Sequence, residues 1–324
     1  MKYIKISNKK LVSLVIIPIL LFMTQASIQV ARAGTGPFDG LTVLYRVKTQ
    51  ADVDALPLDI NALGYDIAIL VEGSGLTIEG LSVHDAEMFG IAVDGQIDVT
   101  VSGCEVYNIG HHTGSEFDPN GGQYGVAIYY YASSGRIDSN IVWNYQKNGI
   151  TANLPSSDGE SVNIIDNTVT GFGQIDFIAQ NGIQLGWDAK GLVKGNTVSG
   201  NWYTGGYWVA CNILLVYTEG VKVLDNELIG GQVGIYAYGD DNKVNGNDVE
   251  GEQYGEYDSY GYGSWGIIVY GDNNKVVRNT IGPYDVGAEI WGNNNKLIRN
   301  TFDDCVENVL DFGEGTKIHA NVYP

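Results

Sequence analysis

The chain has 324 residues and a formal net charge of −20, with 44 glycines and 18 lysines and arginines in total. A surface this acidic repels nucleic acid and anionic lipid, so the composition excludes nucleic acid and the membrane surface as partners. Tyrosine outnumbers phenylalanine by 21 to 8, which favours half-exposed strands over a closed apolar core.

The N-terminus has the pattern of an export signal. Four lysines precede an apolar run from Leu11 to Met23, and Ala31-Arg32-Ala33 follows as a small-residue cleavage site. The sequence therefore predicts a signal peptide over residues 1–33 and a secreted or extracytoplasmic protein, in the periplasm or at the cell surface. The alternative is an uncleaved N-terminal anchor. No later segment is apolar enough to cross a membrane.

Residues 34–63 show no repeat and are predicted to cap the first coil of the repetitive region that follows. The segment from Thr49 to Leu56 suits one or two helical turns, which Pro57 would end. A cap is expected because an exposed edge of parallel strands invites aggregation.

From residue 64 onward the sequence repeats. The segment Tyr-Gly-Asp-Asp-Asn-Lys-Val-Asn-Gly-Asn ends at Asn247, and related segments end at Asn279, Asn300 and Asn321. The same frame can be followed backward through the chain, and its marker positions are 81, 104, 140, 167, 196, 226, 247, 279, 300 and 321. The recurring separation is 21 residues, so the longer units carry insertions.

Each unit contains three short alternating strands separated by glycine or asparagine turns, as residues 182–199 illustrate. Three strands and three turns in this length predict one coil of a parallel β-helix, with coils stacked ~4.8 Å apart. Asparagine tolerates the left-handed backbone of a tight bend, and its amide bonds to the same group in the next coil. The marker asparagines are therefore predicted to form a structural ladder between the second and third strands.

The unit, written G-[IV]-x-[LIVA]…[VI]-x-x-N-x-[VI], resembles the right-handed parallel β-helix repeat of the pectate-lyase-like superfamily. The resemblance covers residues 64–324. It implies an all-β fold, a single right-handed solenoid of about ten three-strand coils with lateral loop insertions. That scaffold carries lyases, hydrolases, epimerases, adhesins and metal-delivery proteins, so the fold does not decide the function.

The insertions gather at the third turn, over residues 111–122, 174–180, 202–210 and 252–262, and only residues 154–159 lie at the first turn. In the resembled superfamily, polysaccharide runs along the first-strand face beside these loops. The outward residues of that strand and the loop aromatics predict a carbohydrate-binding groove. Its predicted contacts are Tyr129, Tyr131, Gln184, Trp202, Tyr207, Trp208, Tyr236, Tyr238, Tyr270 and Trp291. The alternative is that these tyrosines favour strands and only stack on one another.

Catalytic machinery is less evident. A uronate lyase needs a base, usually lysine or arginine in this superfamily, and we expect Arg136, Lys147 and Lys190 to be solvated turn residues. What remains is a loop cluster predicted to act as general acid and base or to hold a divalent metal. Its members are His111, His112, Glu116, Asp118 and Asp176. The alternative is that these side chains are merely exposed.

The adjacent acids Asp240 and Asp241 invite comparison with a calcium site or a glycosidase pair. The acid at position 241 is asparagine in the next two copies, while the neighbouring glycine, lysine and closing asparagine remain. This pattern indicates a turn of the repeat. The remaining possible role of calcium is that of a cofactor that bridges the acidic protein to an acidic glycan.

The three cysteines, Cys104, Cys211 and Cys305, lie too far apart in the frame for a disulfide and are predicted to be buried free thiols.

The leading functional hypothesis is a secreted polysaccharide-binding protein that, in its stronger form, cleaves its glycan as a lyase or hydrolase. The alternatives are a non-catalytic cell-surface or adhesion module and a periplasmic copper-site maturation protein. Because no cap follows Asn321, the C-terminal end of the solenoid is a predicted surface for a dimer.

Overall fold

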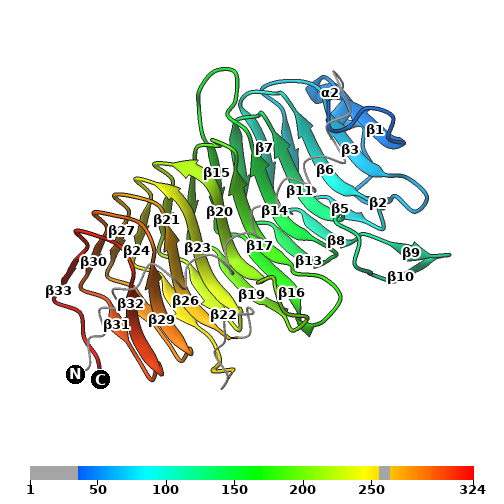
Figure 1. Ribbon diagram of the computed structural model, residues 1–324. Helices are drawn as coiled ribbons and strands as arrows, with labels where there is room; N and C mark the ends of the chain where they lie inside the picture. The colour runs from blue at the N-terminus through cyan, green and yellow to red at the C-terminus, as the bar shows by residue number, and fades with distance from the viewer. Residues whose placement is uncertain (1–35, 255–262) are drawn as a thin grey trace.

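The structure is a computed structural model that describes residues 36–254 and 263–324. The predicted signal peptide and residues 255–262 of the fourth third-turn insertion lie outside the described residues. The chain winds into a solenoid with three long sheets whose strands are all parallel (Figure 1). Connections between parallel strands are right-handed almost without exception, and the predicted right-handed parallel β-helix is confirmed.

The three sheets correspond to the three predicted strands of each coil. The first-strand sheet contains β1 (Val43–Val47), β3 (Ile67–Val71), β6 (Phe89–Asp94), β11 (Val126–Tyr131), β14 (Asn148–Asn153), β17 (Asn181–Gly186), β20 (Cys211–Glu219), β23 (Val233–Asp240), β26 (Trp265–Tyr270), β29 (Val286–Ile290) and β32 (Glu307–Asp311). The second-strand sheet contains β4 (Thr77–Glu79), β7 (Val99–Ser102), β12 (Gly135–Asp138), β15 (Val162–Ile165), β18 (Gly191–Lys194), β21 (Lys222–Leu224), β24 (Lys243–Asn245), β27 (Lys275–Val277), β30 (Lys296–Ile298) and β33 (Lys317–His319). The third-strand sheet contains β2 (Asp59–Asn61), β5 (Ser82–His84), β8 (Glu105–Ile109), β13 (Ile141–Tyr145), β16 (Thr168–Ile175), β19 (Thr197–Tyr203), β22 (Glu227–Ile229), β25 (Asp248–Glu250), β28 (Thr280–Ile281) and β31 (Thr301–Phe302).

The N-terminal segment contains the expected helix, α2 (Gln50–Asp54), which begins at a capping box. The backbone N–H of Asp52 donates to the Thr49 hydroxyl, and the Asp52 carboxylate accepts from the Thr49 N–H at 2.9 Å. The segment also supplies two strands, because β1 pairs with β3 and β2 pairs with β5. The described residues contain no helix long and apolar enough to cross a bilayer.

The core is a set of apolar columns inside the coils. In the first-strand sheet, one inward column has zero exposure throughout: Ile69, Ile91, Ile128, Ile150, Ile183, Ile213, Ile235 and Ile267. β-branched side chains pack well in such stacked strands and have few rotamers to lose. Burying each column removes apolar surface from water at every coil, which is what holds the solenoid together.

The predicted asparagine ladder is present. The side-chain oxygen of Asn196 accepts both the backbone N–H and the side-chain amide of Asn167, each at 2.9 Å, and Asn226 does the same for Asn196. The column of asparagines runs from Asn140 to Asn321, and Cys104 occupies the same corner one coil earlier, where its N–H donates to the Asn140 side chain. These residues are architecture, because their polar groups are used by neighbouring coils.

The acidic pair at 240 and 241 is also architecture. The Asp240 carboxylate accepts the backbone N–H of Asp272 in the next coil at 2.7 Å. Asp241 has φ of 55°, and its counterparts Asn273 and Asn294 have φ of 59° and 56°. Aspartate and asparagine are the non-glycine residues that adopt this left-handed backbone most readily, which explains the exchange.

The cysteines are free, as predicted, although only two are fully buried. Cys104 and Cys211 are 1% exposed, whereas Cys305 is partly exposed near the last coil. Association of two chains through that last coil stays a prediction.

Candidate functional site

A cavity of about 490 Å³ lies over the outer face of the first-strand sheet. This is within the size range of small-molecule sites, which are concave and mostly apolar with a few placed polar groups. Its floor comes from the neighbouring strands β11, β14, β17 and β20, with Phe89 of β6 at one end and Tyr236 of β23 at the other. We call it the groove cavity.

Polar side chains of successive coils are linked across this floor. The amide of Asn148 donates to the Thr151 hydroxyl at 3.0 Å and to the Gln184 oxygen at 3.1 Å. Gln184 donates in turn to Asn153 at 3.2 Å, and Asn153 donates to the Tyr129 hydroxyl at 3.3 Å. The chain of bonds fixes the direction of each amide, so the floor presents an ordered polar strip between rings.

Insertions form the walls of the groove cavity. The third-turn loops contribute Tyr124, Phe177 to Ala179, and Trp208 along one edge, and Leu154 and Trp187 from the first turns line the other. Beyond this set, the N-terminal residue Phe38 packs edge-on against Phe89, Tyr129 and Tyr131, with ring centroids 5.3, 5.8 and 6.2 Å apart. These three ring contacts form an aromatic wall on the side of the N-terminal coils.

Lys147 corrects a sequence-based expectation. It was expected to be a solvated turn residue, but it lines the groove cavity and its ammonium donates to the Ala179 carbonyl at 2.6 Å. Burial lowers the pKa of this ammonium from its ordinary value of 10.5 to about 8. The reason is the insertion at 174–180, which folds over the residue preceding β14. Among the described residues that line the cavity, Lys147 is the one charged side chain.

Half of the predicted substrate contacts meet in this cavity. Those that line it are Tyr129, Tyr131, Gln184, Trp208 and Tyr236. Trp202 does not: it is 2% exposed and stacks on Tyr254, with ring centroids 6.1 Å apart, so the third-turn wall buries it. This corrects its assignment as a sugar contact.

The other predicted aromatics lie outside the cavity. Tyr207 is 60% exposed in the third-turn loop. Tyr238 and Tyr270 contact each other farther along the solenoid at a ring-centroid distance of 4.9 Å, and Trp291 stacks on Phe312 at 4.2 Å. Tyr238, Tyr270 and Trp291 form a column of rings at the first turn. A role for this column in binding stays a prediction.

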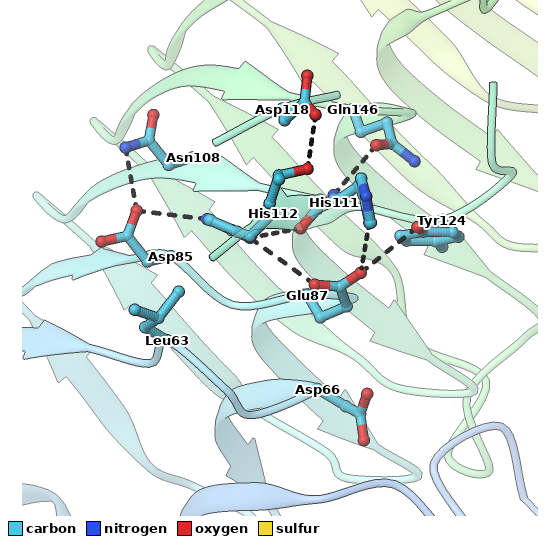
Figure 2. A network of polar contacts seen from close by, with 12 residues as sticks. Leu63, Asp66, Asp85, Glu87, Asn108, His111, His112, Asp118, Tyr124 and Gln146 are labelled. Carbon is cyan, nitrogen blue, oxygen red and sulfur yellow. Dashed lines mark hydrogen bonds and ion pairs between the residues drawn. The ribbon is translucent and has the colours of Figure 1, made fainter. Parts of the chain in front are cut away.

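The predicted histidine cluster lies on the third-turn side of the early coils (Figure 2). His111 is partly exposed, and its Nδ1 lies 3.2 Å from Oε1 of Glu87. His112 is almost fully buried, with 4% of its side chain exposed. Its Nδ1–H donates to the Gly110 carbonyl at 2.8 Å, and its Nε2 faces Asp85 Oδ1 at 3.5 Å. Nε2 makes no hydrogen bond within the described residues, and little of the ring is exposed, so the assignment of His112 as a catalytic residue stays a prediction.

Asp85 anchors this cluster from the preceding coil. Burial opposes its ionisation, but hydrogen bonds from His84 and Asn108, at 2.8 and 3.1 Å, outweigh it and hold the pKa of the carboxyl below its ordinary value. Asp85 therefore stays charged at neutral pH. Figure 2 shows its carboxylate beside the His112 ring.

The remaining predicted acids are dispersed. Glu116 is exposed on the hairpin of β9 (His112–Thr113) and β10 (Glu116–Phe117), and Asp118 accepts the Thr113 hydroxyl at 2.7 Å. Asp176 is exposed on the next insertion, and the polar contacts of the described cluster do not include it. The two insertions are connected instead through a ring of β16: Phe172 lies 6.0 Å from Phe117 and 6.4 Å from Phe177, measured between ring centroids.

The groove cavity and the histidine cluster are joined by one side chain. Tyr124 lines the cavity, and its hydroxyl donates to Oε1 of Glu87 at 3.4 Å, the same oxygen that contacts His111. Sequence reasoning missed Glu87, Asp85 and Tyr124. One signal was available: positions 85, 108 and 144 repeat with the separations 23 and 36 of the marker positions, which indicates a second polar corner.

The described residues contain no group of three histidine, cysteine, aspartate or glutamate side chains arranged to hold a metal ion. The alternative role of the histidine cluster as a divalent metal site is therefore not supported by its geometry. Asp85 accepts from an asparagine, Glu87 contacts a histidine and Asp118 accepts from a hydroxyl.

Comparisons with known proteins agree with the fold. Residues 59–208 match the family described as "right handed beta helix region", and residues 178–323 match the family described as "periplasmic copper-binding protein (NosD)". No curated protein sequence matches the chain.

The solved structures that are similar in fold include the following two, which have TM-scores above 0.5. DFA-IIIase from Arthrobacter chlorophenolicus A6 in complex with GF2 has a TM-score of 0.54 and 14% identity, covering 94% of this chain and 79% of its own. The periplasmic alginate epimerase AlgG has a TM-score of 0.51 and 14% identity, covering 79% of this chain and 70% of its own. At these identities the likeness concerns the fold alone.

Proposed function

We propose that this right-handed parallel β-helix protein binds a polysaccharide segment in the groove cavity. The observation that carries the proposal is the composition of the cavity: rings alternate with amide and hydroxyl groups along successive coils. Aromatic faces suit the apolar faces of sugar rings, and ordered amides suit their hydroxyls. One structural neighbour is named an alginate epimerase, which supports a carbohydrate ligand.

An extracytoplasmic location fits this proposal. The N-terminus has an export-signal pattern, and both the NosD family and AlgG are described as periplasmic. A copper function for this chain lacks a matching donor set, because the described part of residues 178–323 contains no methionine and its Cys211, Cys305 and His319 belong to no metal-holding group.

The test is retention on glycans after a single substitution. Trp208→Ala removes a ring that lines the cavity and is expected to weaken binding about tenfold, since such a contact contributes ~1.4 kcal/mol. Trp143→Ala is the matched control, because Trp143 stacks on Tyr107 of the third-strand sheet and does not line the cavity. Equal binding by both variants across uronic-acid and neutral polysaccharides would remove the cavity as the binding site.

Cleavage of the bound glycan is a second candidate, and the shared side chain Tyr124 favours it. Through Tyr124, the Glu87–His111 pair reaches the edge of the cavity, so a proton relay could serve a bound sugar. Glu87→Gln is then expected to abolish formation of reducing or unsaturated ends while retention persists. Retention without any product by the unaltered protein would instead identify a non-catalytic cell-surface or adhesion module.

A further inference from the structure

The ammonium of Lys147 has fewer partners than its three N–H groups require. Among the described residues, the Ala179 carbonyl is the one acceptor within hydrogen-bond distance, and no carboxylate lies within ion-pair distance. An enclosed charge without a counter-charge is unfavourable unless a ligand or water supplies the missing contacts. Lys147 is half-buried and lines the groove cavity.

Within the described part of the chain, the surroundings of this ammonium contain no anion at neutral pH. Its titratable neighbours in the cavity are Cys211 and the tyrosines, and burial raises the pKa of Cys211, Tyr129 and Tyr236 above their ordinary values. These groups stay neutral where Lys147 is charged. Glu87 and His111 lie behind Tyr124 and do not line the cavity. The protein has a net charge of −20, yet the described residues that line this cavity include one positive side chain and no negative one.

We propose that Lys147 selects a sugar that bears a carboxylate, so that the groove cavity binds a uronic-acid glycan. The proposal rests on glycan binding in the groove cavity and specifies its substrate class. A lysine ammonium is a point charge suited to a singly charged group, and desolvation by the walls strengthens the pair. The amides of Asn148 and Gln184 lie on the same floor and are placed to contact the sugar hydroxyls. The ion pair also removes the need for a bridging calcium ion in an otherwise acidic protein.

The experiment compares binding of native and carboxyl-reduced oligosaccharides. Oligosaccharides from pectate and alginate, each before and after reduction of their carboxylates to alcohols, are titrated calorimetrically into the full chain in EDTA. At least one native uronate is expected to bind tenfold or more tightly than its reduced form. Lys147→Met should remove this preference and leave affinity for the reduced form within about twofold. Lys190→Met, at an exposed first-turn position, is the matched control and should retain the preference.

A pH series of the unaltered protein gives a second measurement that needs no variant. Uronate affinity is expected to fall by up to about tenfold per pH unit above the pKa of Lys147, while affinity for the reduced sugar stays level. Equal affinity for native and reduced forms, or a preference that survives in Lys147→Met, would overturn the role of Lys147 but leave glycan binding intact. Binding of neither form would overturn glycan binding in the cavity as well.

Discussion

The asparagine ladder predicts how strongly a single internal amide stabilises the solenoid. Asn196 has no exposed surface, and its oxygen accepts two donors from Asn167. In Asn196→Ala, the backbone N–H of Asn167 loses its acceptor inside the protein, which costs about 1–3 kcal/mol. The substitution also removes the bond to Asn226 and the bond to the Ile164 carbonyl, each worth about 1 kcal/mol. The expected loss in the free energy of unfolding is therefore about 3–5 kcal/mol.

Asn321→Ala is the matched control, because Asn321 occupies the same corner in the last coil. It accepts the same pair of bonds from Asn300, but it is partly exposed, so water replaces the lost contacts. We expect a loss of about 1 kcal/mol there. The assay is urea denaturation followed by circular dichroism, with the slope compared between variants because stacked repeats can unfold in stages. Equal losses at positions 196 and 321 would refute the argument that burial makes the ladder stabilising.

Two further predictions follow from ionisable groups. The folded protein releases the Lys147 proton above a pKa of about 8, whereas the unfolded chain keeps it to about 10.5, so stability should rise with pH across this window. Urea midpoints that run parallel for the unaltered protein and Lys147→Met from pH 7.5 to 10.5 would contradict this. Burial raises the pKa of Cys305 to about 11 and raises that of Cys211 further, so a thiol reagent at pH 8 should label only Cys305, and slowly. Rapid labelling of a Cys305→Ser variant in the native state would contradict the buried positions of Cys104 and Cys211.

The solenoid could be predicted because its determinants are local and repeated. Asn196 and its counterparts recur at the same position of each repeat, next to an apolar strand. Every copy therefore predicts a turn at the same corner of the coil. The inward isoleucines follow from the period-2 alternation of each strand. The exchange of Asp241 for asparagine in later copies likewise identified a turn, and φ values near 55° give its physical reason.

The site could be predicted only in part, because the insertions determine it and they obey no repeat. Lys147 stands at a turn in the sequence, and only the fold of residues 174–180 over it turns a solvated lysine into an enclosed one. For Trp202 the repeat frame predicts an exposed ring, but a third-turn loop of the same kind buries it. Nε2 of His112 lies 3.5 Å from Asp85 of the preceding coil, and that proximity depends on the path of the β9–β10 hairpin.

In this molecule, hydrogen bonding distinguishes residues that stabilise the solenoid from candidate functional residues. In the ladder, the amide of Asn196 donates to neighbouring coils and its oxygen accepts from them, so nothing is left for a ligand. At the groove cavity, Lys147 keeps N–H groups that no described residue accepts. Because enclosed polar groups are normally paired, such a residue in a solenoid indicates where a ligand completes the structure. By this criterion Lys147 is a stronger candidate for a functional residue than Asp240 and Asp241. Unlike those two acids, Lys147 lies outside the repeat frame.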